Sequence, residues 1–122
     1  MLLDTYAWIE MFRGTEKGEK VREILKNNDC YTSALSLAEI SEWAEKESIP
    51  KKPIFETIKN QSIILYPSDA ALEGAGPIKI EKRKSAKGFG LIDAIIMATA
   101  LEYGLKVLTG DKHFLGTDTI ML

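Results

Sequence analysis

Four carboxylates in this chain stand at positions where acids commonly do chemistry: Asp4, Glu39, Asp93 and Asp111. Two of them follow short apolar runs, and the other two lie in predicted helices with apolar faces. Carboxylates gathered at one place repel each other unless a cation joins them, and hard divalent cations prefer oxygen ligands. A fold that brings these four acids together therefore creates a site for Mg²⁺ or Mn²⁺.

No other set of side chains competes for a catalytic role. The chain has one cysteine, Cys30, and one histidine, His113, so it offers neither a zinc cluster nor an internal disulfide. A metal bound by this protein is therefore held mainly by oxygen. We interpret His113 either as a surface turn residue or as a metal or proton-transfer group, because imidazole titrates near neutral pH.

The most informative stretch covers residues 88–114, which include Asp93 and Asp111. Residues 91–103 are apolar on nearly every side, which predicts a helix buried against other layers, and Gly104 follows as a C-cap. The next apolar run predicts a buried strand at residues 105–108, with Phe114 beyond it as a core anchor. These elements place both acids at one edge of a core.

Short strands and helices alternate along the whole chain. We expect strands at residues 1–5, 30–32, 62–66, 105–108 and 119–122. Expected helices precede residue 91 at residues 6–12, 16–27, 54–60 and 68–72, and another helix is expected to hold Leu37, Ile40 and Trp43. This alternation predicts an α/β domain with a central parallel sheet of four or five strands and helices on both faces. Parallel sheets bind ligands beyond the carboxyl ends of their strands, where Asp4 and Asp111 are expected.

Two helices carry local signals that affect the prediction. Ser36 suits the N-cap of its helix, with Glu39 at the capping-box offset. The helix that starts at Ser68 is expected to break or bend around residues 74–77, since glycine and proline disfavour a helix interior.

Each acid also has a purely structural explanation. Asp4 and Asp93 suit the N-caps of the helices at which they stand, Asp111 suits a turn after Gly110, and Glu39 suits a capping box. Together these explanations require a coincidence of acids at one sheet edge. We therefore favour a shared site.

Length and composition narrow the class of protein. At 122 residues, 45% hydrophobic and 28% charged, the chain is predicted to be a single domain over residues 1–122. It has no run of about 20 apolar residues for a membrane span and no basic signal-peptide start, so we expect a cytoplasmic protein. The net charge of −2 disfavours nucleic-acid binding by bulk electrostatics, but not an enzyme that reaches phosphates through cations.

One part of the chain concentrates positive charge. Lys82, Arg83, Lys84 and Lys87 follow one another closely, shortly before the apolar helix. We interpret this basic run either as a solvated helix face and loop or as an RNA-binding element that contacts phosphates near the acids.

The order and spacing of these motifs resemble the PIN domain, and within it the VapC-like toxin ribonucleases. In that family an apolar helix that opens with Asp is followed by a strand and a Thr-x-Asp turn, and the segments Leu2-Leu-Asp-Thr and Leu37-Ala-Glu-Ile also fit. The resemblance spans the chain. It matches the family's four acids to Asp4, Glu39, Asp93 and Asp111. It matches the hydroxyl residues that often accompany them to Thr5 and Thr109.

The resemblance implies a metal-dependent endoribonuclease whose four acids are catalytic and hold one or two Mg²⁺ or Mn²⁺ ions. It also implies an RNA substrate, a cognate antitoxin protein that covers the active edge, and a homodimer. Two positions depart from the family pattern: His113 stands where many members have another Asp, and Gly110 where a basic residue is common. The number of metal ions and the substrate contact at this turn therefore stay open.

Two other classes of function remain. A catalytically weak PIN-like module would bind RNA or protein without cutting, and a metal-titrated cleavage assay separates it from a nuclease. An Asp-nucleophile phosphatase or phospho-acceptor domain is suggested by Asp4 at the end of a first strand. Tyr6 stands where the phosphatase motif has its second Asp, so trapping of a phospho-aspartate would be needed to support this class.

Overall fold

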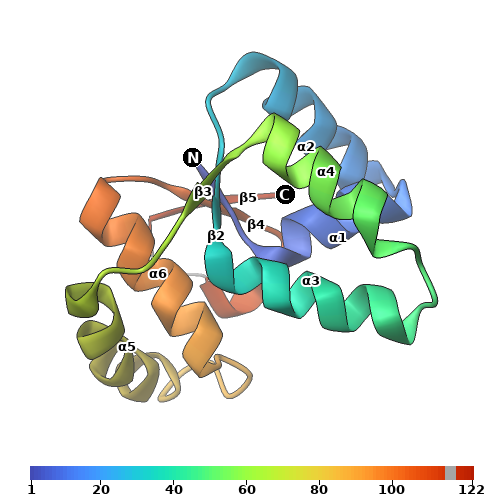
Figure 1. The fold of residues 1–122 in the computed structure, drawn as a ribbon. Helices are drawn as coiled ribbons and strands as arrows, with labels where there is room; N and C mark the ends of the chain where they lie inside the picture. The colour runs from blue at the N-terminus through green and yellow to red at the C-terminus, as the bar shows by residue number, and fades with distance from the viewer. Residues whose placement is uncertain (115–117) are drawn as a thin grey trace.

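The computed structural model describes residues 1–114 and 118–122, and consists of alternating short strands and helices (Figure 1). The strands are β1 (Leu2–Leu3), β2 (Tyr31–Ser33), β3 (Ile63–Leu65), β4 (Val107–Thr109) and β5 (Thr119–Met121). The helices are α1 (Thr5–Arg13), α2 (Glu16–Asn27), α3 (Ala34–Lys46), α4 (Lys51–Gln61), α5 (Asp69–Lys82) and α6 (Leu91–Tyr103), and a 3₁₀ turn, η1 (Lys112–Phe114), follows β4. Among the described residues, no helix is long and apolar enough to cross a membrane.

The strands form one parallel sheet in the order β3-β2-β1-β4-β5, which confirms the predicted sheet. The central strand is β1, whose Leu3 pairs with Thr32 of β2 on one side and with Leu108 of β4 on the other. The chain adds strands outward from β1 as far as β3, and then returns across the sheet to β4. This reversal between β1 and β4 is the topological switch point, where parallel sheets leave a crevice at their carboxyl edge.

Helices cover both faces of the sheet, as predicted (Figure 1). Leu3 and Leu108 face α1 to α4, in a core that includes the buried Trp8. The preceding residues Leu2 and Val107 point the other way, toward α5 and α6, because successive side chains on a strand alternate between faces. Coverage on both sides explains why the central β1 has two apolar residues, both of them buried, rather than an alternation of apolar and polar ones.

Helix α6 has the bounds that the sequence predicts, Leu91–Tyr103, and residues 94–100 are all buried. It packs against α5 and the sheet at once. Gly104 has a φ of 65° and is the predicted C-cap, since glycine adopts this left-handed conformation without strain. Beyond β4, the predicted anchor Phe114 is fully buried, with its ring 5.6 Å from that of Phe89.

Helix α3 begins earlier than predicted, so the assignment of Ser36 as its N-cap is wrong. The N-cap is Ser33, whose Oγ accepts the backbone N–H of Leu35 at 3.2 Å. The reason is that β2 runs directly into α3, so the last strand residue caps the helix. Glu39 consequently lies in the second turn and is not a capping-box partner. Ser36 is buried and faces α1.

Of the break or bend predicted around residues 74–77, the break is wrong, because α5 runs continuously over Asp69–Lys82 with its proline inside the helix. Ala71 and Ala75 of α5 are buried, and the helix packs closely along α6. Tertiary packing thus stabilises a helix that intrinsic propensity disfavours. Ser68, where the sequence predicts that this helix starts, is its N-cap, and its Oγ accepts the backbone N–H of Ala71 at 3.1 Å.

Helix α4 begins at Lys51 rather than at the predicted Ile54. Pro53 therefore lies in the first turn instead of before the helix. Proline is tolerated there because the first backbone N–H groups of a helix have no intrahelical partner to lose.

Candidate active site

The predicted acids lie at the carboxyl edge of the sheet, around the switch point. Asp4 directly follows β1, and its backbone N–H donates to a β4 carbonyl at 3.2 Å. Thr109 ends β4, and Asp111 lies two residues beyond it. Asp93 reaches this edge from the first turn of α6, and Glu39 from the second turn of α3. Four different elements therefore contribute the acids.

Asp4 is almost completely buried, with 3% of its surface exposed. Its Oδ1 accepts the backbone N–H of Ala7 at 2.8 Å, so the N-cap explanation is confirmed, while Oδ2 accepts a hydrogen bond from Thr109 Oγ1. Burial raises the pKa of Asp4 to about 7, although the two hydrogen bonds oppose the rise, and the negative charges of Asp111 and Asp93 add to it. Asp4 thus caps α1, but its burial disfavours the ionised form of its carboxyl group.

Asp93 is not the N-cap of α6, which is Gly90. Asp93 occupies the third helical position, and its Oδ2 accepts the backbone N–H of Gly90 at 2.9 Å, the return bond of a capping box. Burial raises the pKa of Asp93, the bond from Gly90 opposes this, Asp111 raises the pKa further and His113 lowers it. Asp93 is therefore close enough to the β4 turn to respond to its charges.

Glu39 projects from α3 toward the start of α1. Its Oε1 lies 2.5 Å from Thr5 Oγ1, which is also 3.1 Å from Ser36 Oγ. Burial raises the pKa of Glu39, the hydrogen bond from Thr5 opposes the rise, and the charge of Asp93 adds to it. A hollow of about 260 Å³ opens beside this glutamate, lined by Ala38, Glu39, Glu42 and Ile92. The hollow connects the acid on α3 with the start of α6.

Asp111 is held by its own turn. Its backbone N–H donates to Thr109 Oγ1 at 2.8 Å, and its Oδ1 accepts the backbone N–H of His113 at 2.9 Å. The same Oδ1 lies 2.9 Å from Nδ1 of His113, an ion pair when the imidazole is protonated. The His113 ring lies against Gly88, where an added Cβ would be 2.2 Å from Cε1 of the ring. His113 is therefore an integral neighbour of the acids, and its side chain is 41% exposed.

The four acids form one electrostatically coupled group. Asp93 interacts with Glu39, with Asp4 and with Asp111, so it links the acid on α3 to those on β1 and β4. Chemically, a set of carboxylate oxygens suits a hard divalent cation. Within residues 1–114 and 118–122, however, no three His, Cys, Asp or Glu groups are already arranged to hold a metal ion. The chemistry of these carboxylates therefore fits such an ion, but their side chains would have to move closer together to bind it.

Thr5 and Thr109, the predicted companions of the acids, each donate a hydrogen bond to one of them, Thr5 to Glu39 and Thr109 to Asp4. Sequence reasoning missed Ser36, which it treated as a helix cap. The signal that could have identified Ser36 is its position three residues before Glu39, which places both side chains on one face of α3.

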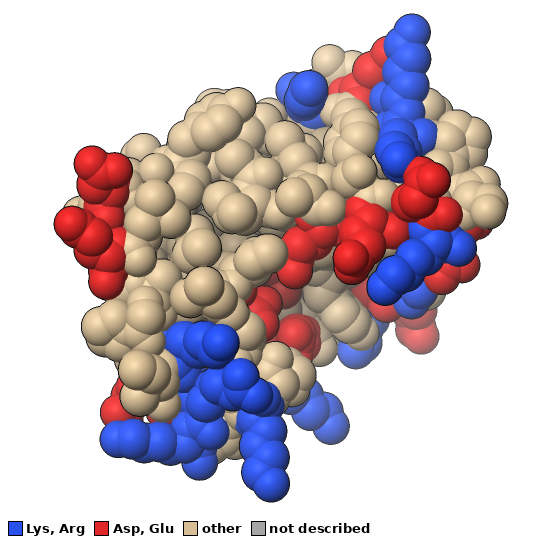
Figure 2. Space-filling view, turned by 60° about the horizontal axis from the view of Figure 1, so that its bottom comes forward, with Lys and Arg blue, Asp and Glu red and all other residues tan. Residues whose placement is uncertain are grey.

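The basic run lies beside the acids. Figure 2 shows Asp and Glu in a band across the centre of this face, with Lys and Arg gathered next to it over the end of α5. Arg83, Lys84 and Lys87 are exposed, whereas Lys82 is half-buried, with Nζ 5.8 Å from the centre of the Phe89 ring. Lys84 Nζ is 2.9 Å from a carboxylate oxygen of Glu81. The position of the run near the acids is compatible with phosphate contact.

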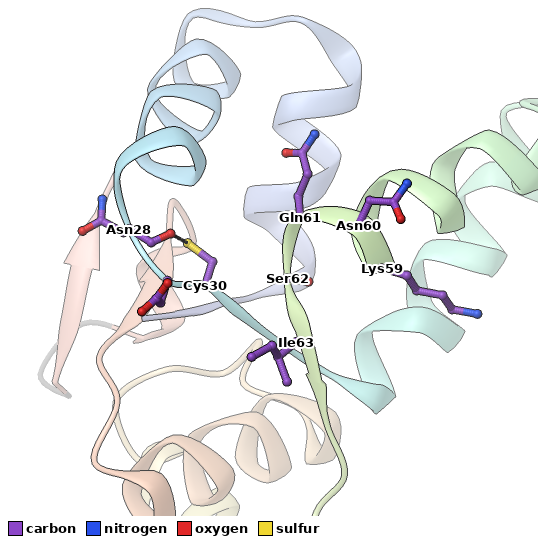
Figure 3. Close-up of a pocket in the computed structure, with 8 residues that line it drawn as sticks. Asn28, Cys30, Lys59, Asn60, Gln61, Ser62 and Ile63 are labelled. Carbon is purple, nitrogen blue, oxygen red and sulfur yellow. Dashed lines mark hydrogen bonds between the residues drawn. The ribbon is translucent and has the colours of Figure 1, made fainter.

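Another hollow lies at the opposite, amino edge of the sheet (Figure 3). It has a volume of about 300 Å³ and is lined by Asn28, Asp29, Cys30, Lys59, Asn60, Gln61, Ser62 and Ile63. Burial raises the pKa of the Cys30 thiol, which disfavours the nucleophilic thiolate. This hollow therefore offers no clear catalytic group, and the acids are not part of it.

Comparisons with known proteins agree on the fold. Among solved structures, a toxin–antitoxin complex from Klebsiella pneumoniae matches with a TM-score of 0.73 and 24% identity, over 94% of this chain and 90% of that chain. VapC20 of Mycobacterium tuberculosis, described as a sarcin-ricin loop cleaving toxin, matches with a TM-score of 0.78 and 13% identity, over 99% and 98% of the two chains. DNA-bound VapBC from Salmonella typhimurium matches with a TM-score of 0.71 and 23% identity, over 98% and 93%.

At these identities, the solved structures establish a shared fold. A search of curated proteins finds no match. The PIN domain model, in contrast, matches residues 1–119, nearly the whole chain. The single α/β domain with its parallel sheet and its edge of acids therefore belongs to the PIN domain family.

Proposed function

We propose that residues 1–122 form one nuclease domain, a metal-dependent endoribonuclease that hydrolyses phosphodiester bonds in RNA as the toxin of a VapBC-type pair. The observation that carries this proposal is the coupling of four acids at the switch point. Burial raises the pKa values of Asp4, Glu39 and Asp93, and neighbouring negative charges raise them further. A group of acids that disfavours its own ionisation is stabilised by a divalent cation.

Asp4, Glu39 and Asp93 are the proposed principal ligands of one or two Mg²⁺ or Mn²⁺ ions, and Asp111 is a further ligand, directly or through water. A bound ion of this kind supplies a Lewis acid that polarises the phosphate and activates water. Thr109 fixes one oxygen of Asp4, and Thr5 fixes one oxygen of Glu39. These hydroxyls would keep the carboxylates oriented while the oxygen lone pairs that accept no hydrogen bond bind the ion.

The proposed substrate contact is the basic run of Lys82, Arg83, Lys84 and Lys87. The net charge of −2 means that the protein as a whole does not attract RNA strongly. A local group of cations beside the acids can still position the phosphate backbone, since phosphate contacts orient a nucleic acid without reading its sequence.

We propose a cognate antitoxin and a second copy of this chain as protein partners, in the cytoplasm where RNA is available. Toxin–antitoxin complexes among the structural neighbours support the antitoxin. Exposed large apolar side chains on α5 and α6 support a dimer, because soluble proteins usually cover such groups: Leu72, Ile80, Leu91, Leu101 and Tyr103.

The test is cleavage of single-stranded or looped RNA by the purified protein, with Mg²⁺ or Mn²⁺ and with excess chelator. We expect cleavage only with metal. Asp4→Asn should abolish it, although asparagine can still cap α1. The matched control Asp69→Asn removes an exposed acid in the first turn of α5 and should leave cleavage unchanged. Cleavage that survives both chelator and Asp4→Asn would exclude the proposed mechanism.

The alternative is a PIN-like module that binds RNA or protein without cutting it. His113 favours this alternative, because it adds an imidazole beside Asp111 at a position where many family members have another acid. Full metal titration without cleavage, together with retained RNA or protein binding, would identify the protein as such a module.

A further inference from the structure

An aromatic ring lies at the same edge as the acids. Tyr6, in the first turn of α1, is half-buried, and its ring lies against the backbone of Gly110. A Cβ added at Gly110 would be 2.3 Å from Cε1 of Tyr6, closer than real Cβ atoms come to a neighbour. Glycine at this position therefore allows the ring to approach the peptide that leads directly into Asp111.

A cation accompanies this ring. Lys17, exposed in the first turn of α2, has its Nζ 5.7 Å from the centre of the Tyr6 ring. This is within the range of a cation–π contact, which is weak at an exposed site and easily exchanged for another partner. A flat aromatic surface and an exposed positive charge thus lie together near Asp4 and Asp111.

We propose that Tyr6 and Lys17 bind one nucleotide of the RNA next to the bond that is cut, with the base stacked on Tyr6 and the phosphate near Lys17. The inference rests on the proposed nuclease function and adds a substrate requirement to it. Stacking needs an accessible face of an unpaired base, and every base has one. Tyr6 would therefore select single-stranded or looped RNA over duplex, with little preference among the four bases.

A purely structural role for Tyr6 would give a different result from stacking. In that case, the ring only supports the turn at Gly110, and its loss would disturb Asp111 regardless of whether the RNA carries bases. A stacking contact, in contrast, needs both the ring and a base, so loss of the ring weakens the binding only of RNA that carries bases. Comparing the affinity for RNA with the affinity for a base-free backbone therefore separates the two roles.

The experiment measures binding by fluorescence anisotropy in chelator, where no cleavage occurs. The probes are a short single-stranded oligoribonucleotide and an abasic oligomer of equal length. We expect Tyr6→Leu to weaken binding of the oligoribonucleotide by roughly 5-fold to 100-fold, and binding of the abasic oligomer hardly at all. Tyr6→Phe retains the ring and should bind both probes like the wild type. Melting curves report whether each variant folds.

Lys17 is tested through salt dependence. Lys17→Gln should make the slope of log affinity against log salt shallower by about 0.7, the value for one phosphate contact on a single strand. The matched control Lys20→Gln removes an exposed lysine from the same helix and should leave the slope unchanged. Equal slopes for wild type and Lys17→Gln would show that Lys17 makes no phosphate contact and would overturn its proposed role.

Equal weakening of both probes by Tyr6→Leu, or of neither, would overturn the stacking role. Should Tyr6→Leu fail to fold, the wild type and Tyr6→Phe decide the matter, since both must prefer the oligoribonucleotide to the abasic oligomer. Cleavage with Mn²⁺ is assayed separately. Cleavage without base-dependent binding overturns the stacking alone, whereas base-dependent binding without cleavage overturns the nuclease and supports the stacking.

Discussion

Thr109 Oγ1 donates a hydrogen bond to Oδ2 of Asp4, joining the end of β4 to the end of β1. The same hydroxyl accepts the backbone N–H of Asp111 at 2.8 Å. One buried side chain thus fixes the orientation of two acids. The bond to Asp4 also lowers that residue's pKa, against the larger effect of burial.

Thr109→Val tests this relationship, because valine keeps the shape of threonine without its hydroxyl. We expect the unfolding free energy to fall by about 1–3 kcal/mol, since the N–H of Asp111 loses its partner, and metal affinity to fall because Asp4 holds its proton more tightly. Calorimetric titration with Mn²⁺ and denaturant unfolding measure the two effects. Thr99→Val is the matched control.

Thr99 is equally buried, and its hydroxyl donates to the Ile95 carbonyl within α6 at 2.8 Å, away from the acids. The control should change stability without changing metal affinity. Equal metal affinities in wild type and Thr109→Val would show that this hydroxyl does not orient a ligand.

The raised pKa of Asp4 predicts a pH-dependent stability in metal-free protein. Between its ordinary value of 3.8 and the folded value of about 7, the folded protein binds more protons at Asp4 than the unfolded chain does. The stability due to this group is therefore full below the lower value and is lost as pH rises through the window. Asp4→Asn lacks this loss, so its unfolding free energy relative to wild type should increase by roughly 2–4 kcal/mol from acidic to neutral pH.

Urea unfolding in chelator, repeated across this pH range, measures the difference. Saturating Mg²⁺ should reduce it, because the ion favours the ionised carboxylate. A constant difference between the two proteins at every pH would mean that Asp4 titrates normally.

Asp93→Asn separates helix capping from metal binding. Asparagine can also accept the N–H of Gly90, but removes a charge that is repelled by Asp111 and Glu39. Metal-free stability should hold or rise. Metal at about 100 times its dissociation constant should stabilise the wild type by about 2.7 kcal/mol, and the variant by less.

Melting curves with and without metal measure these increments, and Asp69→Asn supplies the same charge change on α5, away from the acids. The control should retain the full metal-induced increment. An equal increment in Asp93→Asn would exclude Asp93 as a ligand.

The basic run can be tested by replacing Lys82, Arg83 and Lys84 together with alanine. We expect weaker RNA binding and a shallower salt dependence, with the slope reduced by up to about 0.7 for each phosphate that the variant no longer neutralises. The matched control replaces Lys20, Arg22 and Lys26, an exposed set of the same composition on α2. Binding titrations at several salt concentrations decide the question. Identical slopes for the two triple variants would show that the basic run is a solvated surface that makes no phosphate contact.

The sequence predicted elements whose signal is local and strong. The helix at Leu91–Tyr103 is apolar on nearly every side and ends at a glycine, so its own residues predict both its burial and its C-terminal end. Asp4 and Asp111 were placed correctly because parallel strands bring their carboxyl ends to one edge. In contrast, the cap of α3 is Ser33 rather than the predicted Ser36, because the start of this helix depends on where β2 stops, which the pairing partners of β2 decide.

The contacts within the site could not be read from the chain. The bond between Thr5 and Glu39 joins α1 to α3, and the packing of His113 on Gly88 joins η1 to a distant loop. Such contacts depend on the relative placement of elements to within a few ångströms. The continuous α5 has the same origin, because its packing on α6 outweighs the glycines and proline in its sequence.

The central position of β1 has a consequence for the order of folding. Asp4 and its partner Thr109 are 105 residues apart, whereas β1 and β2 are close neighbours in sequence. During synthesis, β1 can meet β2 early, but the acid edge cannot close until β4 has been made. Pairing over such a long loop is also slow. The helices that pack around β1 and β2 can therefore begin to form before the edge that carries the acids is complete.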